Sequence, residues 1–509
     1  MSEPTVDLQA LAQKAGIAPE YVVPYGREVA KIELGALGSK EQKARYVVVT
    51  ATSPTPFGEG KTTTAIGLVQ GMAKIDRNAV LTIRQPAQGP VFGIKGGATG
   101  NGASQVEPAT LINLHLTGDF HAITAAHNLL SAIIDNHLYQ GNELEIEERS
   151  ITWPRVLDVN DRALRHIVTG LGGRIDGVTR QSSFDITPAS EVMVIMSLAT
   201  SLKDLRERLG RIVIGRSKSG KWITAEDLQA AGAMTALLRD ALQPNLLRTS
   251  ENTPVLIHTG PFGNIATGCS SVVADLIAAQ HADYVVTEAG FGADMGAERF
   301  FDLKCAVSGL RPHAAVLVTT VRSLKSHSGK FKITTGKGLP EQMLAESPQD
   351  VRAGQANLLK HIEIVRGFGM EPVVAINVFP TDHESELAEI EAIAREAGAR
   401  VARSYGVVRG GEGCTELAQA VEQACQASEG QNQARPLYER EDDLKTKIAK
   451  VAAMYGADGV DYTPAAAKLL ATYQAEGFGE LNVVVARLAL TPVLRVLPPA
   501  GACPFARCA

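Results

Sequence analysis

Short apolar runs and longer amphipathic segments alternate along most of this chain. The apolar runs predict strands at Tyr46–Val49, Ala79–Ile83, Pro254–His258, Tyr284–Thr287, Ala314–Val321 and Pro372–Ile376. Helices are predicted at Ala189–Leu198, Leu202–Leu209, Ala225–Leu242, Cys269–Ala279, Asn357–Gly367 and Glu384–Ala399. Such alternation is typical of parallel sheets with helices on both faces. The pattern therefore predicts an α/β fold with a doubly wound, mainly parallel sheet, whose ligands lie at the carboxyl ends of the strands.

The two ends of the chain have a different pattern. Residues 1–45 predict short helices, one at Leu8–Ala15 and one near Val29–Leu34. At Cys425–Pro436 the composition becomes that of a linker, and the charged amphipathic segment Glu439–Tyr455 after it predicts a helix. We therefore expect a large domain over residues 1–365, a smaller α/β domain over 366–435 and a C-terminal domain over 436–509.

The stretch Tyr46–Lys74 combines an apolar strand, a glycine-containing turn and a helix-compatible segment. Backbone N–H groups in such a loop, together with the positive end of the helix dipole, bind phosphate groups. The stretch matches the phosphate-loop pattern G-x-x-x-x-G-K-[ST] except that Thr55 stands at the first glycine position. In this interpretation Lys61 reaches the terminal phosphates and the Thr62 hydroxyl reaches Mg²⁺. The predicted nucleotide-binding residues are Thr55, Pro56, Phe57, Gly58, Glu59, Gly60, Lys61, Thr62 and Thr63.

A second glycine-rich segment follows closely, with six glycines between Gly89 and Gly102. So many glycines disfavour a regular element, which leaves either a floppy loop or a backbone that approaches a ligand closely. Arg84 precedes the segment and Lys95 lies within it, which favours an anion. The candidate anion-binding residues are Arg84, Lys95, Gly96 and Gly97.

Acidic residues follow the apolar strand Tyr284–Thr287. Glu288 ends it and Asp294 lies in the loop beyond, where phosphate-loop proteins hold Mg²⁺ or its water. With Thr62 they make the predicted metal site. His115, Asp119 and His121 have a spacing compatible with metal ligation and equally with a buried hydrogen-bonded cluster, and no sequence rule separates the two.

Composition narrows the classes of protein. The 509 residues are 45% hydrophobic and 21% charged with a net charge of −5, which is ordinary for a globular protein and gives no support to nucleic-acid binding. The first residues resemble neither a signal peptide nor a transit peptide, and the longest apolar stretch, Ala122–Ile134, is too short to span a membrane. The six cysteines form no CxxC pair, so we expect reduced thiols in the cytoplasm.

Taken together, these motifs resemble the formate–tetrahydrofolate ligase (10-formyltetrahydrofolate synthetase) family. The resemblance is carried by Pro54–Thr64, Gly89–Gly102, Ile112–Asn128, Val156–Arg165, Phe184–Met193, Pro261–Gly268, Thr287–Cys305, Val321–His327, Asn377–Asp382 and Gly410–Gly413. It implies ATP-dependent joining of formate to tetrahydrofolate through formyl phosphate, with ADP and phosphate released. Lys61 and Arg84 are then the expected catalytic residues.

The resemblance has further implications. Mg²⁺ with ATP, a monovalent cation (K⁺ or NH₄⁺) and a homotetramer are expected, with no nucleic-acid or membrane partner. The large domain would bind ATP and formyl phosphate, and residues 366–435 would form the folate side. The expected folate-binding residues are Phe379, Pro380 and Val407.

The chain departs from the family pattern at several positions. Gln85 replaces a glutamate of the motif Arg-Glu-Pro-Ser, and Val407 replaces an aromatic residue that stacks on the pterin. From Arg487 the sequence no longer follows the family, and its composition is typical of a reading-frame shift or a divergent C-terminus. Two alternatives therefore stay open: a nucleotide-binding homologue with impaired folate binding or lost catalysis, and another carboxylate-activating phosphate-loop ligase, such as one resembling dethiobiotin synthetase.

Overall fold

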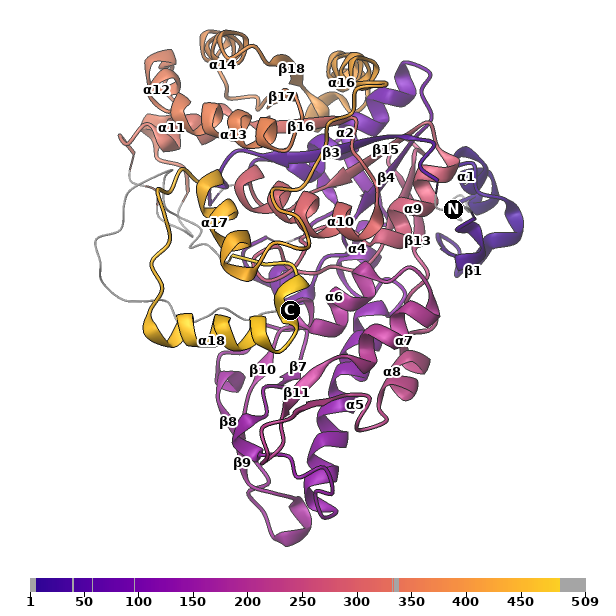
Figure 1. Cartoon of the computed structure of the whole chain (residues 1–509). Helices are drawn as coiled ribbons and strands as arrows, with labels where there is room; N and C mark the ends of the chain where they lie inside the picture. The colour runs from indigo at the N-terminus through magenta and orange to yellow at the C-terminus, as the bar shows by residue number, and fades with distance from the viewer. Residues whose placement is uncertain are drawn as a thin grey trace.

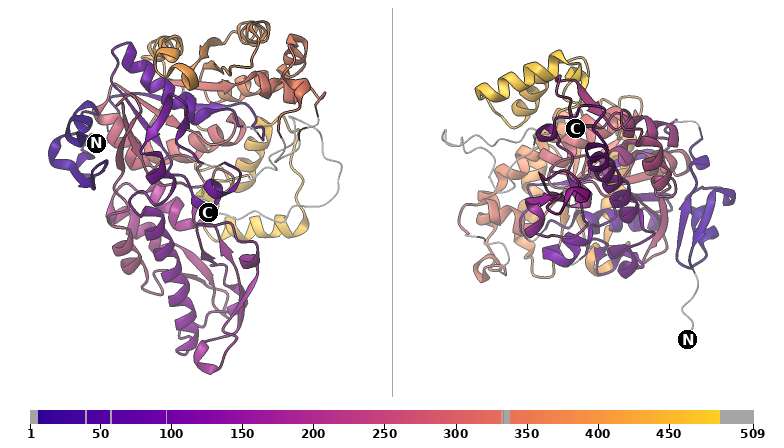
Figure 2. Two further views of the ribbon diagram at one scale, coloured as in Figure 1. Left: turned by 180° about the vertical axis from the view of Figure 1, so that it is seen from behind. Right: turned by 90° about the horizontal axis from the view of Figure 1, so that it is seen from below.

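A broad part that contains the main sheet and a narrower lobe that projects from it make up the molecule (Figure 1). The structure is a computed structural model that describes residues 6–38, 41–56, 58–95, 97–331, 333 and 338–485. Seen from behind, the lobe extends from the same end of the sheet region, and the N-terminal elements lie at one side of it (Figure 2).

The main sheet contains strands from nearly the whole described chain. Its spatial order is β1 (Val22–Tyr25), β2 (Val29–Ile32), β13 (Asn245–Thr249), β14 (Pro254–Ile257), β4 (Ala79–Ile83), β15 (Tyr284–Glu288), β3 (Arg45–Ala51), β16 (Ala314–Thr319), β17 (Pro372–Asn377) and β18 (Arg400–Ser404). The short strands β5 (Gly100–Asn101) and β6 (Ser104–Glu107) extend it beside β13. All neighbours from β14 to β18 are parallel. The predicted α/β fold with a mainly parallel sheet is confirmed.

Helices cover both faces of this sheet because its strands are apolar on both sides. On β3, Tyr46 and Val48 belong to one buried cluster and Val47 and Val49 to the other. The first cluster includes residues of α1 (Leu8–Lys14), α9 (Val272–His281), α13 (Gln355–Gly367) and α14 (Glu384–Glu396). The second includes residues of α2 (Lys61–Lys74) and α16 (Thr415–Ser428). Alternate side chains of one strand therefore anchor two layers of helices.

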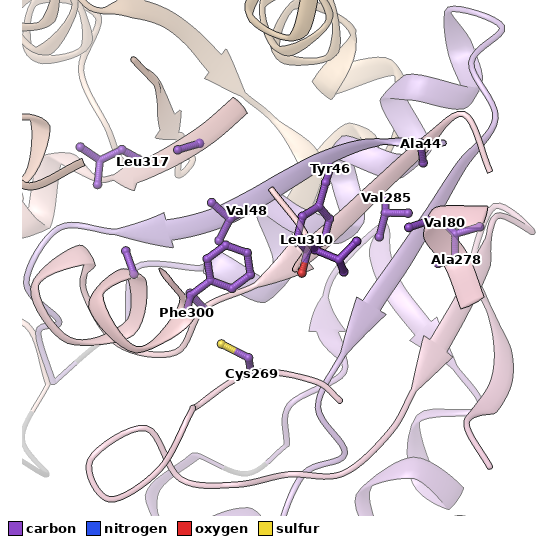
Figure 3. Packing of buried hydrophobic residues seen from close by; sticks show 14 of the residues in the cluster. Ala44, Tyr46, Val48, Val80, Cys269, Ala278, Val285, Phe300, Leu310 and Leu317 are labelled. Carbon is purple, nitrogen blue, oxygen red and sulfur yellow. The ribbon is translucent and has the colours of Figure 1, made fainter. Parts of the chain in front are cut away.

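The first of these clusters shows how distant segments share one core. In Figure 3, Tyr46 and Val48 of β3 lie near Val285 of β15 and Phe300 of the segment after it. The Tyr46 and Phe300 rings are 5.6 Å apart between centroids, a favourable tilted arrangement. This face of the sheet is thus closed by the same segment that follows Glu288.

The projecting lobe has its own apolar core. Its helices are α5 (Asp119–Tyr139), α6 (Glu191–Leu198), α7 (Leu202–Gly210) and α8 (Ala231–Leu238), and its short strands are β7 (Arg155–Val156), β8 (Ile167–Thr169), β9 (Arg180–Ser182), β10 (Phe184–Asp185), β11 (Val213–Arg216) and β12 (Trp222–Thr224). The long helix α5 runs along the lobe (Figure 1). The lobe packs beside the loops that follow β4 and β14, which brings it close to the carboxyl ends of the strands.

The remaining helices complete the molecule. They are α3 (Gln88–Pro90), α4 (Ala109–Asn113), α10 (Ala306–Ser308), α11 (Val321–His327), α12 (Pro348–Ala353), α15 (Gly406–Arg409), α17 (Leu444–Met454) and α18 (Pro464–Ala475). The C-terminal helices contact both parts of the protein. The Tyr455 hydroxyl donates to the Asp294 carbonyl oxygen at 2.6 Å, and Glu476 accepts from Trp222 Nε1 at 2.7 Å.

Two expectations about secondary structure are wrong. The segment near Val29–Leu34, expected as a helix, forms β2, because its apolar residues are buried between β1 and β13. The helix expected over Ala225–Leu242 is shorter, at Ala231–Leu238. The domain boundary at 365/366 stays a prediction; the sheet continues across it through β17 and β18. The expectation about the tail from Arg487 lies outside the described residues.

Candidate active site

The first glycine loop connects the end of β3 to Lys61, the first residue of α2. Gly58 and Gly60 have φ values of +72° and +76°, a left-handed conformation that favours glycine. A Cβ on Gly60 would lie 2.2 Å from the Asn377 side-chain nitrogen, at the end of β17. Glycine at this position therefore lets the loop lie directly against a neighbouring strand end.

Asparagine side chains hold this loop from two other elements. Asn377 Nδ2 donates to the Glu59 carbonyl oxygen at 3.2 Å. Asn357 of α13 accepts from the Ser53 backbone N–H at 3.3 Å and donates to the Ser53 hydroxyl at 3.0 Å. The buried Glu59 carboxylate accepts from the Thr55 N–H within the loop, and burial raises the pKa of Glu59. The loop conformation is thus determined by the sheet and by α13.

Most of the predicted nucleotide-binding residues are brought together here. Thr55 and Pro56 are half-buried in the loop, and Thr63 is buried in the first turn of α2. The Thr62 hydroxyl lies 2.9 and 3.0 Å from the two carboxylate oxygens of Glu288. Phe57 lies outside the described residues.

The environment of Lys61 is strongly charged. Burial lowers the pKa of the Lys61 ammonium, and the carboxylates of Glu288, Glu59 and Asp294 oppose this effect, whereas Arg84 reinforces it. A lysine beside three carboxylates and an arginine lies where charges of both signs meet, and these charges act on its pKa in opposite directions. The chain thus concentrates both signs of charge at one strand edge although its net charge is only −5.

Asp294 lies in a short π-helical turn, Ala293–Ala297, close to these groups, but its carboxylate has a histidine of α13 as a partner. The distance from its Oδ1 to His361 Nε2 is 3.5 Å, and both side chains are buried. A Cβ on Gly292 would meet Asp294 Oδ1 at 2.6 Å. The tight turn therefore places the Asp294 carboxylate against α13.

Arg84 follows β4 and extends between the loops after β14 and β15. Its Nη1 donates to the Pro261 carbonyl oxygen at 3.0 Å, and a Cβ on Gly290 would lie 2.9 Å from its Nη2. Because Gly290 has no side chain, there is room for the Arg84 guanidinium beside it. Arg84 thus stands at the carboxyl ends of three neighbouring strands.

Residues of the lobe hold the start of the second glycine loop by hydrogen bonds. The Gln88 N–H donates to Asp158 Oδ2 at 3.0 Å, and Asn160 Nδ2 donates to the Gly89 carbonyl oxygen at 3.0 Å. Burial raises the pKa of Asp158 to about 6, and the Gln88 N–H opposes the shift. Later in the loop, the Ala98 N–H donates to Asn113 Oδ1 at 3.1 Å. Gly97 lies beside Asn113, whereas Gly96 and the side chain of Lys95 lie outside the described residues.

The three predicted folate-binding residues follow adjacent strands. Phe379 and Pro380 come after β17, and Val407 lies in α15 just after β18. The Val407 carbonyl oxygen accepts from the Ala103 N–H at 2.9 Å, at the end of the second glycine loop. Phe379 and Val407 are half-buried, and Pro380 is exposed.

The histidine and aspartate cluster of the segment before and within α5 is hydrogen-bonded. Asp119 pairs with Lys31 at 2.6 Å and accepts from Asn245 Nδ2 at 2.8 Å, all buried. His115 Nδ1 lies 2.8 Å from His121 Nε2. Asp119 thus has other hydrogen-bond partners than the two histidines, which contact each other. In the part of the chain that the structure describes, no group of three or more His, Cys, Asp or Glu side chains could hold a metal ion.

Several residues of this site had no role in the sequence interpretation. They are Asn357, Asn377, Asp158 and Asn160, which position the two loops. Asn377 has a recognisable signal, because it is a polar residue at the carboxyl end of an apolar strand. Asp158 and Asn160 lie in Val156–Arg165, a segment that carries the family resemblance, and Asn357 has no signal. Among the described residues, no helix combines the length and apolar character needed to cross a bilayer.

Glycine loops, lysine, arginine and carboxylates at the carboxyl ends of parallel strands are typical of α/β proteins that bind anionic small molecules. The family model described as formate–tetrahydrofolate ligase matches residues 2–491. The chain belongs to the formate–tetrahydrofolate ligase family.

Curated relatives agree with this assignment. A formate–tetrahydrofolate ligase of Cutibacterium acnes is 58% identical over 487 residues, which are 95% of this chain and 86% of the relative. The Saccharopolyspora erythraea protein of the same name has the same identity and coverage. Formate–tetrahydrofolate ligase 3 of Rubrobacter xylanophilus is 54% identical over 505 residues, covering 96% of this chain and 88% of the relative. The predicted family is confirmed, and neither alternative is favoured.

Proposed function

We propose that this protein joins formate to tetrahydrofolate at the expense of ATP, giving 10-formyltetrahydrofolate, ADP and phosphate. The observation that carries the proposal is the assembly of Lys61, Thr62, Arg84 and Glu288 at one strand edge, in a chain that belongs to this family. Formate is a poor acylating agent, so it must be activated before an amine can attack it. Phosphorylation by ATP supplies that activation.

In this proposal, the first glycine loop binds the phosphates of ATP through Thr55 to Thr63, as in a phosphate-loop protein. Support comes from the left-handed glycines and from the loop leading directly into the N-terminus of α2. Lys61 neutralises the charge that develops on the transferred phosphoryl group.

Mg²⁺ fits the donors that surround this loop. The Thr62 hydroxyl and the Glu288 carboxylate already lie within hydrogen-bond distance, and oxygen donors are those that Mg²⁺ prefers. Asp294 is the third candidate. When bound, the ion would neutralise charge on the phosphate oxygens, while Thr62 and Glu288 would hold it or its water.

Activation proceeds by attack of a formate oxygen on the γ-phosphorus. The bond from that phosphorus to the β–γ bridging oxygen breaks, and ADP leaves with the bonding electrons. The Arg84 guanidinium, together with the Lys95–Gly97 part of the second loop, holds the resulting formyl phosphate. A guanidinium fork can pair two oxygens of this anion at once.

Transfer then takes place from formyl phosphate to the folate. The N10 amine attacks the formyl carbon, the carbon–oxygen bond to phosphate breaks, and the N10 proton is passed to the departing phosphate. Phe379, Pro380 and Val407 bind the pterin end of the substrate in this proposal. Their position after β17 and β18, beside both glycine loops, supports that role.

The proposal extends to the organisation of the enzyme. A monovalent cation (K⁺ or NH₄⁺) and a homotetramer are proposed from the family resemblance, and a cytoplasmic location from the absence of a CxxC pair among the six cysteines. The assignment of residues 1–365 to ATP and formyl phosphate and of 366–435 to folate is also proposed from the resemblance.

The test is a set of substrate omissions. Purified protein is incubated with ATP, Mg²⁺, formate and tetrahydrofolate, and ADP and 10-formyltetrahydrofolate are quantified. We expect equal amounts of both products, and no formyl product when any one substrate is omitted. ADP release that is independent of formate and folate, with no formyl product, would overturn the proposal.

A further inference from the structure

A guanidinium lies over the face of the aromatic ring that follows β17. The Arg322 carbon Cζ is 3.9 Å from the centroid of the Phe379 ring, well within the range of a cation–π contact. Arg322 belongs to the first turn of α11, after β16, so the two residues come from adjacent parallel strands. Arg322 Nη2 also donates to the Thr381 hydroxyl at 3.1 Å, which fixes the guanidinium against the ring.

The backbone around Phe379 is held in one conformation. The Phe379 N–H donates to Asp382 Oδ2 at 2.9 Å, and the Asp382 N–H donates to the Phe379 carbonyl oxygen at 3.0 Å. Arg322 Nε is buried without a hydrogen-bond partner. At this position the Nε–H group of Arg322 therefore makes no hydrogen bond, while the guanidinium lies over the ring.

The supported ring stands beside the first glycine loop. Asn377, two residues before Phe379, contacts Glu59 and Gly60 of that loop. Phe379 as a whole is half-buried although Arg322 lies over one face of its ring. After the neighbouring strand β18, the other predicted folate-binding residue is Val407 of α15, whose aliphatic side chain cannot stack.

We propose that Arg322 is a positioning residue for substrate recognition, which holds Phe379 as a one-sided platform for the pteridine ring of the folate. This inference rests on the proposed function. A cation on the far face withdraws electron density from the phenyl ring, so its free face attracts an electron-rich heterocycle more strongly. Because Val407 offers only aliphatic contact, this chain depends on the Arg322–Phe379 pair for its stacking.

Two substitutions separate the charge of Arg322 from its planar shape. Arg322→Met removes the charge and keeps a long side chain, and Arg322→Lys keeps the charge without the planar group. We expect Arg322→Met to raise the KM for tetrahydrofolate by about two- to thirtyfold, and Arg322→Lys to raise it by less. The KM for ATP should stay within about twofold, because no contact of Arg322 reaches Lys61 or Thr62 in the described residues. The matched control is Arg400→Met, an exposed arginine at the start of β18.

A second readout is the binding affinity, measured by calorimetry, for a tetrahydropteridine that lacks the aminobenzoylglutamate part of the folate. The loss of affinity in Arg322→Met should equal that for the whole folate, because the effect resides in the ring. An unchanged folate KM, or equal rises in the KM for ATP and for folate with a lower melting temperature, would overturn the inference. A wild-type protein that makes no 10-formyltetrahydrofolate at all would instead overturn the proposed function, and the pteridine binding comparison would still decide the role of Arg322.

Discussion

The two glycine loops of this protein are held by different parts of the molecule. The first loop is fixed from the main sheet and α13, through Asn377 and Asn357. The second begins on Asp158 and Asn160 of the lobe. Both loops carry glycines, but the first is held by the sheet layers throughout, whereas the second starts on the lobe and joins the sheet only at its end, through β5 and β6.

This difference indicates a division of labour. In the proposed function, the first loop, which the sheet holds, binds the nucleotide phosphates. The start of the second loop depends on how the lobe packs against the sheet, so a change in the lobe can alter the anion site around Arg84. Substitutions in the two loops should therefore have distinguishable consequences.

The largest effect is expected in the first loop. Lys61→Ala should lower kcat by about 10²–10³-fold or more, because a preorganised positive charge at the transferred phosphoryl group is lost. The measurement is 10-formyltetrahydrofolate formation at saturating substrates, with circular dichroism as the control for folding. Full activity in a folded Lys61→Ala protein would contradict the assignment of ATP binding to this loop.

The base of the second loop should show a pH-dependent stability effect. Burial raises the pKa of Asp158 from its usual 3.8 to about 6, so between these values the native state binds more protons than the unfolded chain. Stability should therefore fall as the pH rises through this window, by up to about 3 kcal/mol.

Asp158→Asn removes this titration and keeps an oxygen acceptor for the Gln88 N–H. We expect the melting temperature of the variant to rise relative to that of the wild type as the pH increases from 4 to 7. Melting curves that keep a constant difference across this range would contradict the assignment of the shift to Asp158.

Arg84 tests whether the anion is held by a fork or by charge alone. Arg84→Lys should reduce turnover by at least about tenfold, because an ammonium cannot pair two oxygens of an acyl phosphate. Steady-state kinetics with formate as the varied substrate measure the effect. A loss below about threefold would make Arg84 a structural residue that supports the Pro261 and Gly290 loops.

The smallest effect is expected where the second loop meets α15. Val407→Trp should lower the KM for tetrahydrofolate about two- to tenfold, because an added aromatic contact contributes roughly 0.5–1.5 kcal/mol. The KM for ATP should not change. Folate titrations of the two proteins decide this, and equal folate affinity would show that aliphatic contact at Val407 is sufficient.

Much of the fold could be predicted from local pattern. Runs such as Tyr46–Val49 and Tyr284–Val286 are apolar at every position and rich in β-branched residues, a composition typical of strands buried on both faces. Because parallel strands end at one edge, the sequence also placed Thr62 and Glu288 at the same edge, and they are hydrogen-bonded. The helix expected near Val29–Leu34 was wrong because a short run with three apolar residues suits a helix or a strand equally, and burial against β13 selected the strand.

What the sequence by itself determined were the elements and the types of residue at the ends of the strands. Periodicity and glycine content act over a few residues, so they can be read along the chain. The tertiary structure alone decided that Asn377 would hold the first loop, that Asp158 would hold the second and that Arg322 would lie on Phe379. These contacts join segments that become neighbours only when the strands pair in their spatial order, and local sequence carries no record of that order.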